Sequence, residues 1–261
     1  MKTTKTVSAT VMAIIASVGM ANAGVSQPVP VVEDPATSES VWFRAAAYGW
    51  LSAMEGDVSV GPLTTPVDIS ISDTLDSLDM AFMGLFEVGY DRWSFAVDVI
   101  YAKFSQDIDA GGRLFDSFRY EQKQWFITPV ASYRVIDTDD YMMSVYAGAR
   151  ITSMTVDLTG RFVDGDQLTR GVDTTWVDPL VGLRGQADFG QHWFFRYSGD
   201  IGGFGVSSDL IWSAFAGLGY NFTDSFSVVA GYRGLGIDYS KDAFTMDVVS
   251  HGPLLGLEIS F

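Results

Sequence analysis

The stretch LLGLEISF, Leu254–Phe261, alternates apolar and polar residues. Its apolar positions are Leu255, Leu257, Ile259 and Phe261. Because successive side chains of a strand point to opposite faces, this spacing predicts a strand with one apolar face and one polar face. The same alternation recurs along most of the chain, so this stretch sets the pattern for the fold.

Composition excludes several classes of protein. Charged residues make up 18% of the 261 residues, below the roughly 25% of soluble domains, while aromatic residues reach 14%. There is no cysteine, so disulfides and thiolate metal sites are excluded. The net charge of −16 argues against nucleic acid as a partner, because phosphate binding needs clustered Lys and Arg. We predict no cofactor, no metal ligands and no catalytic residues.

The first residues predict secretion. Lys2 and Lys5 precede an apolar stretch over roughly 7–20, and Ala21-Asn22-Ala23 follows as a small-x-small cleavage pattern. The apolar stretch is too short to span a bilayer as a helix. We therefore expect a signal peptide over 1–23, cleaved near Ala23, a loose Pro- and Ser-containing segment over 24–40, and one domain over 41–261.

Ten long alternating runs follow residue 41. They lie near 41–53, 79–90, 93–106, 119–135, 141–157, 175–189, 192–204, 209–222, 225–238 and 246–261. Helical periodicity is present only near Asp73–Asp79. Long strands joined by turn residues predict an all-β fold.

The connections alternate in length. The short ones lie at 91–92, 136–140, 190–191 and 223–224, and most of the others are longer, at 54–78, 107–118, 158–174 and 239–245, with 205–208 as the exception. Antiparallel barrels of the outer membrane have short periplasmic turns and longer outer loops. We expect the short turns and both chain ends on the periplasmic side.

The composition of the two faces decides between a soluble and a membrane barrel. A soluble lipocalin-like barrel would put its apolar face inward and Lys and Glu in water. Here the polar face is built of Gly, Ser, Ala and Arg, and aromatic residues gather beside the short turns, for example Tyr90, Trp93, Phe222 and Phe226. The runs are also long enough for a tilted crossing, which needs about 9–11 residues. We predict a closed antiparallel transmembrane β-barrel of ten strands.

Eight or twelve strands are the alternatives. Twelve would arise if 57–60 and 67–72 formed a membrane hairpin, which we instead interpret as an extension of the first hairpin above the membrane. We also expect bulges at Pro129 and Pro179, because proline cannot donate to a ladder.

The final strand resembles the terminal β-signal of Gram-negative outer-membrane barrels, and the resemblance to the small OmpA, OmpW and porin-like barrels covers 41–261. It implies a place in the bacterial outer membrane, in contact with its lipids and lipopolysaccharide. It also implies that the barrel-insertion machinery recognises the signal residues Leu255, Leu257, Ile259 and Phe261.

Charged residues on the polar face are the candidate functional set. By parity the lumen-lining residues are Arg44, Arg134, Arg150, Arg184, Arg196 and Arg233, together with Glu87, Asp98, Asp178, Asp188, Asp200 and Glu258. An unpaired buried charge is costly, so we predict a salt-bridge network in which Arg44 and Glu258 meet if the first and last strands are adjacent. Such a network either fills the lumen or lines a polar conduit, and both interpretations stay open.

Three functions follow from these features. The first is an outer-membrane barrel that is structural or passes small solutes in a restricted way. The second is a surface interaction protein whose acidic outer loops, beginning with Glu55, Asp57 and Asp68, bind divalent cations, lipopolysaccharide or host molecules. The third is a lipid-modifying enzyme, which we do not expect: His251 stands beside Ser250, and neighbours on a strand point to opposite faces.

Overall fold

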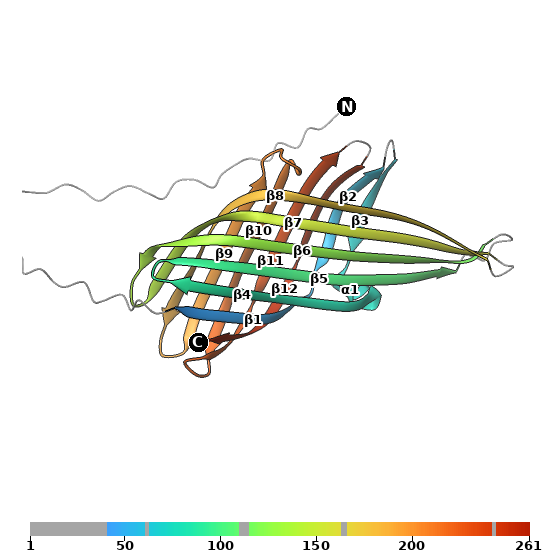
Figure 1. The fold of residues 1–261 in the computed structure, drawn as a ribbon. Coiled ribbons are helices and arrows are strands. Elements are labelled where there is room, and N and C mark those ends of the chain that lie inside the picture. The colour runs from blue at the N-terminus through green and yellow to red at the C-terminus, as the bar shows by residue number, and fades with distance from the viewer. Residues whose placement is uncertain (1–40, 61–62, 110–114, 163–165, 242–243) are drawn as a thin grey trace, which may run out of the picture. The chain divides into compact units, whose positions relative to one another are not determined.

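The computed structural model describes residues 41–60, 63–109, 115–162, 166–241 and 244–261. The predicted signal peptide and N-terminal segment lie outside the described residues. The described chain is almost entirely strand, with one short helix (Figure 1). The elements are β1 (Trp42–Trp50), β2 (Ala53–Val60), β3 (Leu63–Ile69), α1 (Ile71–Ser77), β4 (Leu78–Tyr90), β5 (Trp93–Asp109), β6 (Phe115–Asp137), β7 (Tyr141–Phe162), β8 (Gln167–Phe189), β9 (Trp193–Gly203), β10 (Leu210–Asn221), β11 (Phe226–Lys241) and β12 (Phe244–Ser260).

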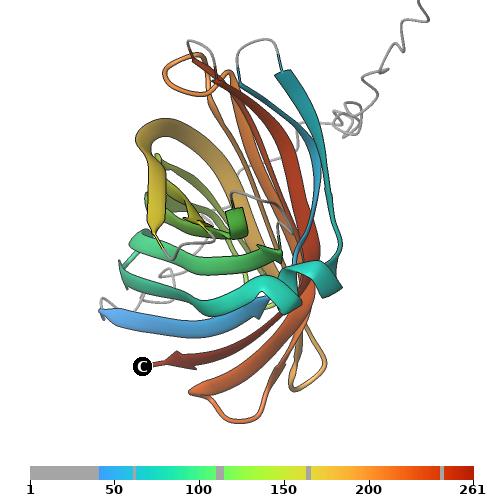
Figure 2. The ribbon, with the colours of Figure 1, turned by 90° about the vertical axis from the view of Figure 1, so that its right-hand side faces the viewer.

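The sheet closes on itself through β1 and β12. From β4 to β12 each strand pairs antiparallel with the next, and β1 pairs with β4 on one side and with β12 on the other. Arg44 lies opposite Glu87 in one pairing and opposite Ser260 in the other. Figure 2 shows the sheet curving round on itself. The predicted closed antiparallel barrel is therefore present.

The predicted number of ten strands is wrong, because the sheet has twelve. The additional strands are β2 and β3, which lie in the region predicted to extend the first hairpin above the membrane. Both β1 and β2 pair antiparallel with β12, β1 with its second half and β2 with its first half. β3 pairs with β2 and forms the free edge of the sheet. Glu55 and Asp57 point into water here while Met54 and Val58 pack on the core. The sequence signal is weak because the outer face of these strands is polar.

Strands β6, β7 and β8 are much longer than a membrane crossing requires. They contain 23, 22 and 23 residues, and in Figure 1 their far ends, together with that of β5, project beyond the remaining strands. Most of the predicted loops at 107–118 and 158–174 are therefore strand. The outer face of this projecting sheet carries ion pairs, such as Arg119 with Asp107 at 3.5 Å and with Glu121 at 3.4 Å. This face is in contact with water instead of lipid. Its outward residues are therefore polar, although the strands stay hydrogen-bonded to one another.

The apolar face points outward, as predicted. Phe86, Phe95 and Leu257 are 50%, 50% and 53% exposed, whereas Glu87 and Arg150 are each 1% exposed. We call the end with the turns 91–92, 138–140, 190–192 and 222–225 the short-turn end. Outward-facing aromatic residues encircle it, namely Tyr90, Trp93, Tyr133, Phe189, Trp193, Phe222 and Phe226. Such a band is typical of a membrane–water interface.

The predicted bulges at Pro129 and Pro179 are absent. Pro129 pairs with Val97 and Pro179 with Ala149, and neither pairing shifts register there. The ladder between β6 and β7 skips Thr128 and Pro129, and the pairing of β8 with β9 begins only after Pro179. Each proline therefore pairs with one neighbouring strand and leaves the other neighbour unpaired at that position. The register of the strands is unchanged.

Helix α1 follows β3 and is too short to bury a face. Ser70 caps it, and hydrogen bonds from Ser70 hold the pKa of Asp73 below its ordinary value. No helix among the described residues is long and apolar enough to cross a membrane.

At Gly148 the backbones of β6 and β7 approach closely, so Gly148→Ala tests the packing between these two strands. A Cβ there would collide with the Pro129 carbonyl oxygen. We expect the substitution to lower the free energy of unfolding by about 1–3 kcal/mol, as overpacking does. The matched control is Gly49→Ala, because a Cβ at Gly49 meets nothing within 4 Å. Urea unfolding in detergent measures both, and equal stabilities would contradict the packing described here.

Candidate functional site

A cavity of about 510 Å³ occupies the lumen at the short-turn end. Turn residues Arg92, Asp224 and Ser225 line its mouth, and Tyr48, Asp98 and Arg150 line its inner part. Its lining is rich in arginine, serine and tyrosine and contains no lysine. Side chains of a strand alternate between the two faces of the sheet, so every second residue of each strand points into the lumen. This alternation brings the polar side chains together there.

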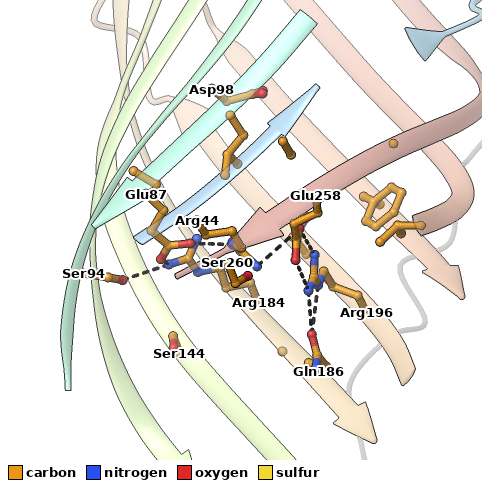
Figure 3. Close-up of a pocket in the computed structure, with 18 of the residues that line it drawn as sticks. Arg44, Glu87, Ser94, Asp98, Ser144, Arg184, Gln186, Arg196, Glu258 and Ser260 are labelled. Atoms are coloured by element: carbon orange, nitrogen blue, oxygen red, sulfur yellow. Dashed lines mark hydrogen bonds and ion pairs between the residues drawn. The ribbon is translucent and has the colours of Figure 1, made fainter. Parts of the chain in front are cut away.

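The most connected group in the cavity is the arginine cluster, which we define as Arg44, Arg184 and Arg196 with Glu87 and Glu258 (Figure 3). Glu87 accepts hydrogen bonds from both Arg44 and Arg184. Arg196 donates to Glu258 through Nη1 at 2.6 Å and Nη2 at 3.1 Å. Arg44 Nη1 lies 3.9 Å from Glu258 Oε2, as expected for adjacent first and last strands.

The cluster ties distant strands together. Arg184 stands on β8 and Glu87 on β4, so their bond crosses the lumen. Arg196 on β9 reaches Glu258 on β12. Two neutral side chains extend the network: Ser94 accepts from Arg184 at 3.0 Å, and Gln186 Oε1 accepts from Arg196 at 2.7 and 3.1 Å.

Two further ion pairs lie deeper in the lumen. Arg233 donates to Asp98 at 3.1 Å and to the Tyr48 hydroxyl at 3.0 Å, and Tyr48 in turn donates to Asp98 at 2.6 Å. Arg150 donates to Asp200 at 3.1 Å and to Thr128 at 3.4 Å. Each of these pairs is balanced, with one guanidinium for one carboxylate.

Beyond these pairs the lumen is filled by apolar side chains, which we call the apolar plug. Its buried members are Trp50, Ile100, Phe126, Trp176, Leu180, Ile211, Leu235, Ile237, Tyr239, Met246 and Val248, while Ala96 and Val130 of the same apolar cluster line the cavity. Trp176 on β8 stacks on Tyr239 on β11 with ring centroids 4.5 Å apart, so the plug has contacts across the lumen. The cavity therefore ends against an apolar cluster.

The structure places ten of the twelve predicted lumen residues in the cavity lining. They are Arg44, Glu87, Asp98, Arg134, Arg150, Arg184, Arg196, Asp200, Arg233 and Glu258. Arg134 also pairs with Asp137 at 2.8 Å beside a short turn.

The other two residues, Asp178 and Asp188, do not line the cavity. Asp178 is fully buried and accepts hydrogen bonds from the Ser208 amide at 2.7 Å and the Ser208 hydroxyl at 2.6 Å. These bonds hold the β9–β10 connection against β8. Asp188 accepts from Gln186 Nε2 at 2.8 Å.

Several uncharged lining residues are absent from the predicted lumen set, which contains only the charged residues of the polar face. Tyr48, Tyr146, Gln186 and Ser94 share the inward parity of the charges on their own strands. Parity would have identified them, whereas a search for charges alone does not.

His251 faces outward, while Ser250 is 7% exposed on the lumen side, so the two do not pair. His251 Nδ1 lies 2.6 Å from the Tyr232 hydroxyl, and Nε2 lies 3.8 Å from Glu55. His192, at the short-turn end, contacts the ring of Tyr220. No group of three or more His, Asp or Glu among the described residues is arranged to hold a metal ion.

Glu87→Gln tests the arginine cluster. The substitution leaves Arg44 and Arg184 without the carboxylate that both contact, and breaking a buried pair on one side costs about 3–5 kcal/mol. We expect a fall of at least about 2 kcal/mol in the free energy of unfolding, since the cavity hydrates part of the cluster. Urea unfolding in detergent measures this, with Glu55→Gln as the control because Glu55 is 67% exposed. An unchanged midpoint for Glu87→Gln would refute the role given to this pair.

A scan against protein-family models finds no match, and a comparison with curated proteins finds none either. Among solved structures, the outer-membrane protease OmpT of Escherichia coli is similar with a TM-score of 0.55 and 12% identity, covering 88% of this chain and 99% of that chain. The transport unit of the Escherichia coli autotransporter AIDA-I has a TM-score of 0.39 and 8% identity, covering 87% of this chain and 92% of that chain, and this weaker likeness carries no argument. The likeness to OmpT concerns the fold alone. Together with the closed sheet and its apolar outer surface, it shows that the chain has the fold of an outer-membrane β-barrel.

Proposed function

We propose that this protein is a barrel of the bacterial outer membrane that is closed at rest and passes small solutes only when the apolar plug rearranges. The observation that carries the proposal is the cavity that reaches the short-turn end and stops at the plug. The predicted signal peptide and the aromatic band support this location, with the short-turn end in the periplasm.

The plug is a barrier of a known kind. Apolar constrictions close pores by excluding water, because a hydrated solute loses its hydrogen bonds there without replacement. Phe126, Trp176 and Leu180 are 7%, 6% and 1% exposed, so water has little access to this layer. A charged lumen favours entry of polar solutes, and the plug limits their passage.

A role in surface interaction is the second candidate, and the projecting sheet favours it. Strands β6 to β8 extend above the expected membrane level, and their outer face presents Thr, Ser and charged side chains to water. At another edge Asp247 lies opposite both Asp238 and Asp57. Lipopolysaccharide or divalent cations at these surfaces would be the partners under this role.

An enzyme is not proposed. His251 has Tyr232 and Glu55 as neighbours on the outer surface, and Ser250 points into the lumen. Lipid turnover by the purified barrel that disappears in His251→Ala would overturn this view.

The C-terminal strand is proposed as the signal for barrel insertion. The apolar side chains of its last residues face outward. Their exposed fractions are 59% for Leu255, 53% for Leu257, 53% for Ile259 and 69% for Phe261. Phe261 is also held by reciprocal backbone hydrogen bonds to Phe43 at 2.7 and 3.0 Å.

Planar-bilayer recordings test the closed lumen. We expect the wild-type barrel to conduct rarely, and the double variant Phe126→Ala/Trp176→Ala to show a several-fold higher open probability, because large side chains leave the plug. Trp125→Ala is the control, since Trp125 precedes Phe126 but is 41% exposed on the outer face. A steady wild-type current would refute closure at rest. A double variant as silent as the control would reject the conduit in favour of surface interaction.

Removal of Phe261 tests the insertion signal. We expect less folded barrel in the outer membrane of a bacterial host but normal refolding of the purified variant in detergent, because only insertion in cells uses the machinery. Gel mobility of unheated samples measures both. Phe222→Ala is the control, an outward aromatic residue at the same end that is 58% exposed. Equal insertion of both variants would reject the signal.

A further inference from the structure

We propose that the arginine cluster binds a small oxyanion, a phosphate or a carboxylate, that enters the cavity from the short-turn end. The inference goes beyond the closed conduit, because a solute can bind in the cavity whether or not the plug ever opens. It rests on charge, burial and the chemistry of the side chains in the cluster.

The charges of the cluster do not balance. Three guanidinium groups, of Arg44, Arg184 and Arg196, share two carboxylates. The next carboxylate, Asp188, contacts Gln186 and does not line the cavity. The deeper pairs are already neutral, so they supply no compensating charge.

The excess remains when the cavity is taken as a whole. Its lining holds seven arginines and five carboxylates, from Arg44, Arg92, Arg134, Arg150, Arg184, Arg196 and Arg233 against Glu87, Asp98, Asp200, Asp224 and Glu258. Arg134 is already paired with Asp137 outside the lining, which leaves an excess of one guanidinium. The entire chain, by contrast, has a net charge of −16. A local excess of positive charge inside an acidic protein indicates a place for an anion.

Burial makes the excess charge costly. The side chains of Arg44, Arg184 and Arg196 are only 19%, 20% and 20% exposed. Arg44 Nε is buried and has no hydrogen-bond partner among the described residues. A buried charge without a counter-charge is destabilising, and a bound anion would supply that counter-charge.

The donors suit an oxyanion. Guanidinium groups present N–H donors in a planar fork that matches carboxylate and phosphate oxygens. Figure 3 shows the three arginines converging from different strands, with Ser94 and Ser260 beside them. The cavity of about 510 Å³ leaves room for such an ion with its first water molecules.

The test is isothermal titration calorimetry of the full barrel in detergent, with inorganic phosphate in one arm and succinate in the other at constant ionic strength set by chloride. We expect saturable binding of at least one probe, and the stronger arm assigns the class of anion. Arg196→Gln leaves two guanidinium groups for two carboxylates and is expected to weaken binding by about tenfold or more. The control Arg119→Gln changes an exposed arginine of the projecting sheet and is expected to bind as wild type.

A charge-swap variant separates anion binding from a structural role of Arg196. Gln186→Glu combined with Asp188→Asn keeps every arginine and the net charge, but moves one carboxylate onto Arg196, which already donates to Gln186. We expect this folded variant to lose binding by about tenfold as well, since the cluster is then neutral. No saturable binding of either probe to the wild type, or wild-type binding by the charge-swap variant, overturns the proposal. Neither result bears on the conductance of the plug.

Discussion

Hydrocarbon offers no partner to a backbone N–H or C=O, and the whole structure follows from that constraint. The sheet meets it by pairing β1 with β12, so that the membrane-facing part has no free edge. Once the sheet is closed, every strand has an outward face in lipid and an inward face in the lumen. The apolar outer surface and the charged interior are therefore two results of one condition.

The lumen has two levels with opposite chemistry. At the short-turn end, guanidinium and carboxylate groups from opposite walls hold one another and leave a hydrated cavity between them. Farther in, Trp176, Tyr239 and their neighbours exclude water. Bonds such as Arg184 to Glu87 and Arg233 to Asp98 cross between strands that are not neighbours in the sheet, so they brace the wall against flattening.

The sequence allowed the membrane-spanning part of the fold to be predicted, because alternation is strong where one face meets lipid. It identified the inward charges and the proximity of Arg44 to Glu258. It failed above the membrane, where the outer face of β2 and of the ends of β6 to β8 is polar and the apolar outward face that marks a membrane strand is missing.

The apolar plug was not predicted for a different reason. Ile100 and Phe126 share the inward parity of the charged residues, so parity alone does not separate them from a polar lining. What separates the two levels is height along the barrel axis, and height depends on the register of every strand pair. That register is a property of the closed sheet, which a single sequence does not display.

Strand β12 has a double attachment with a consequence for biogenesis. Its later half pairs with β1 and its earlier half with β2, so both tiers of the wall join residues about two hundred positions apart in the chain. Contacts of such long sequence separation form slowly, because so much intervening chain has to be ordered first. Until these pairings form, β1, β2 and β12 have unpaired strand edges. A chaperone that shields those edges would govern the fraction of the protein that reaches the folded state.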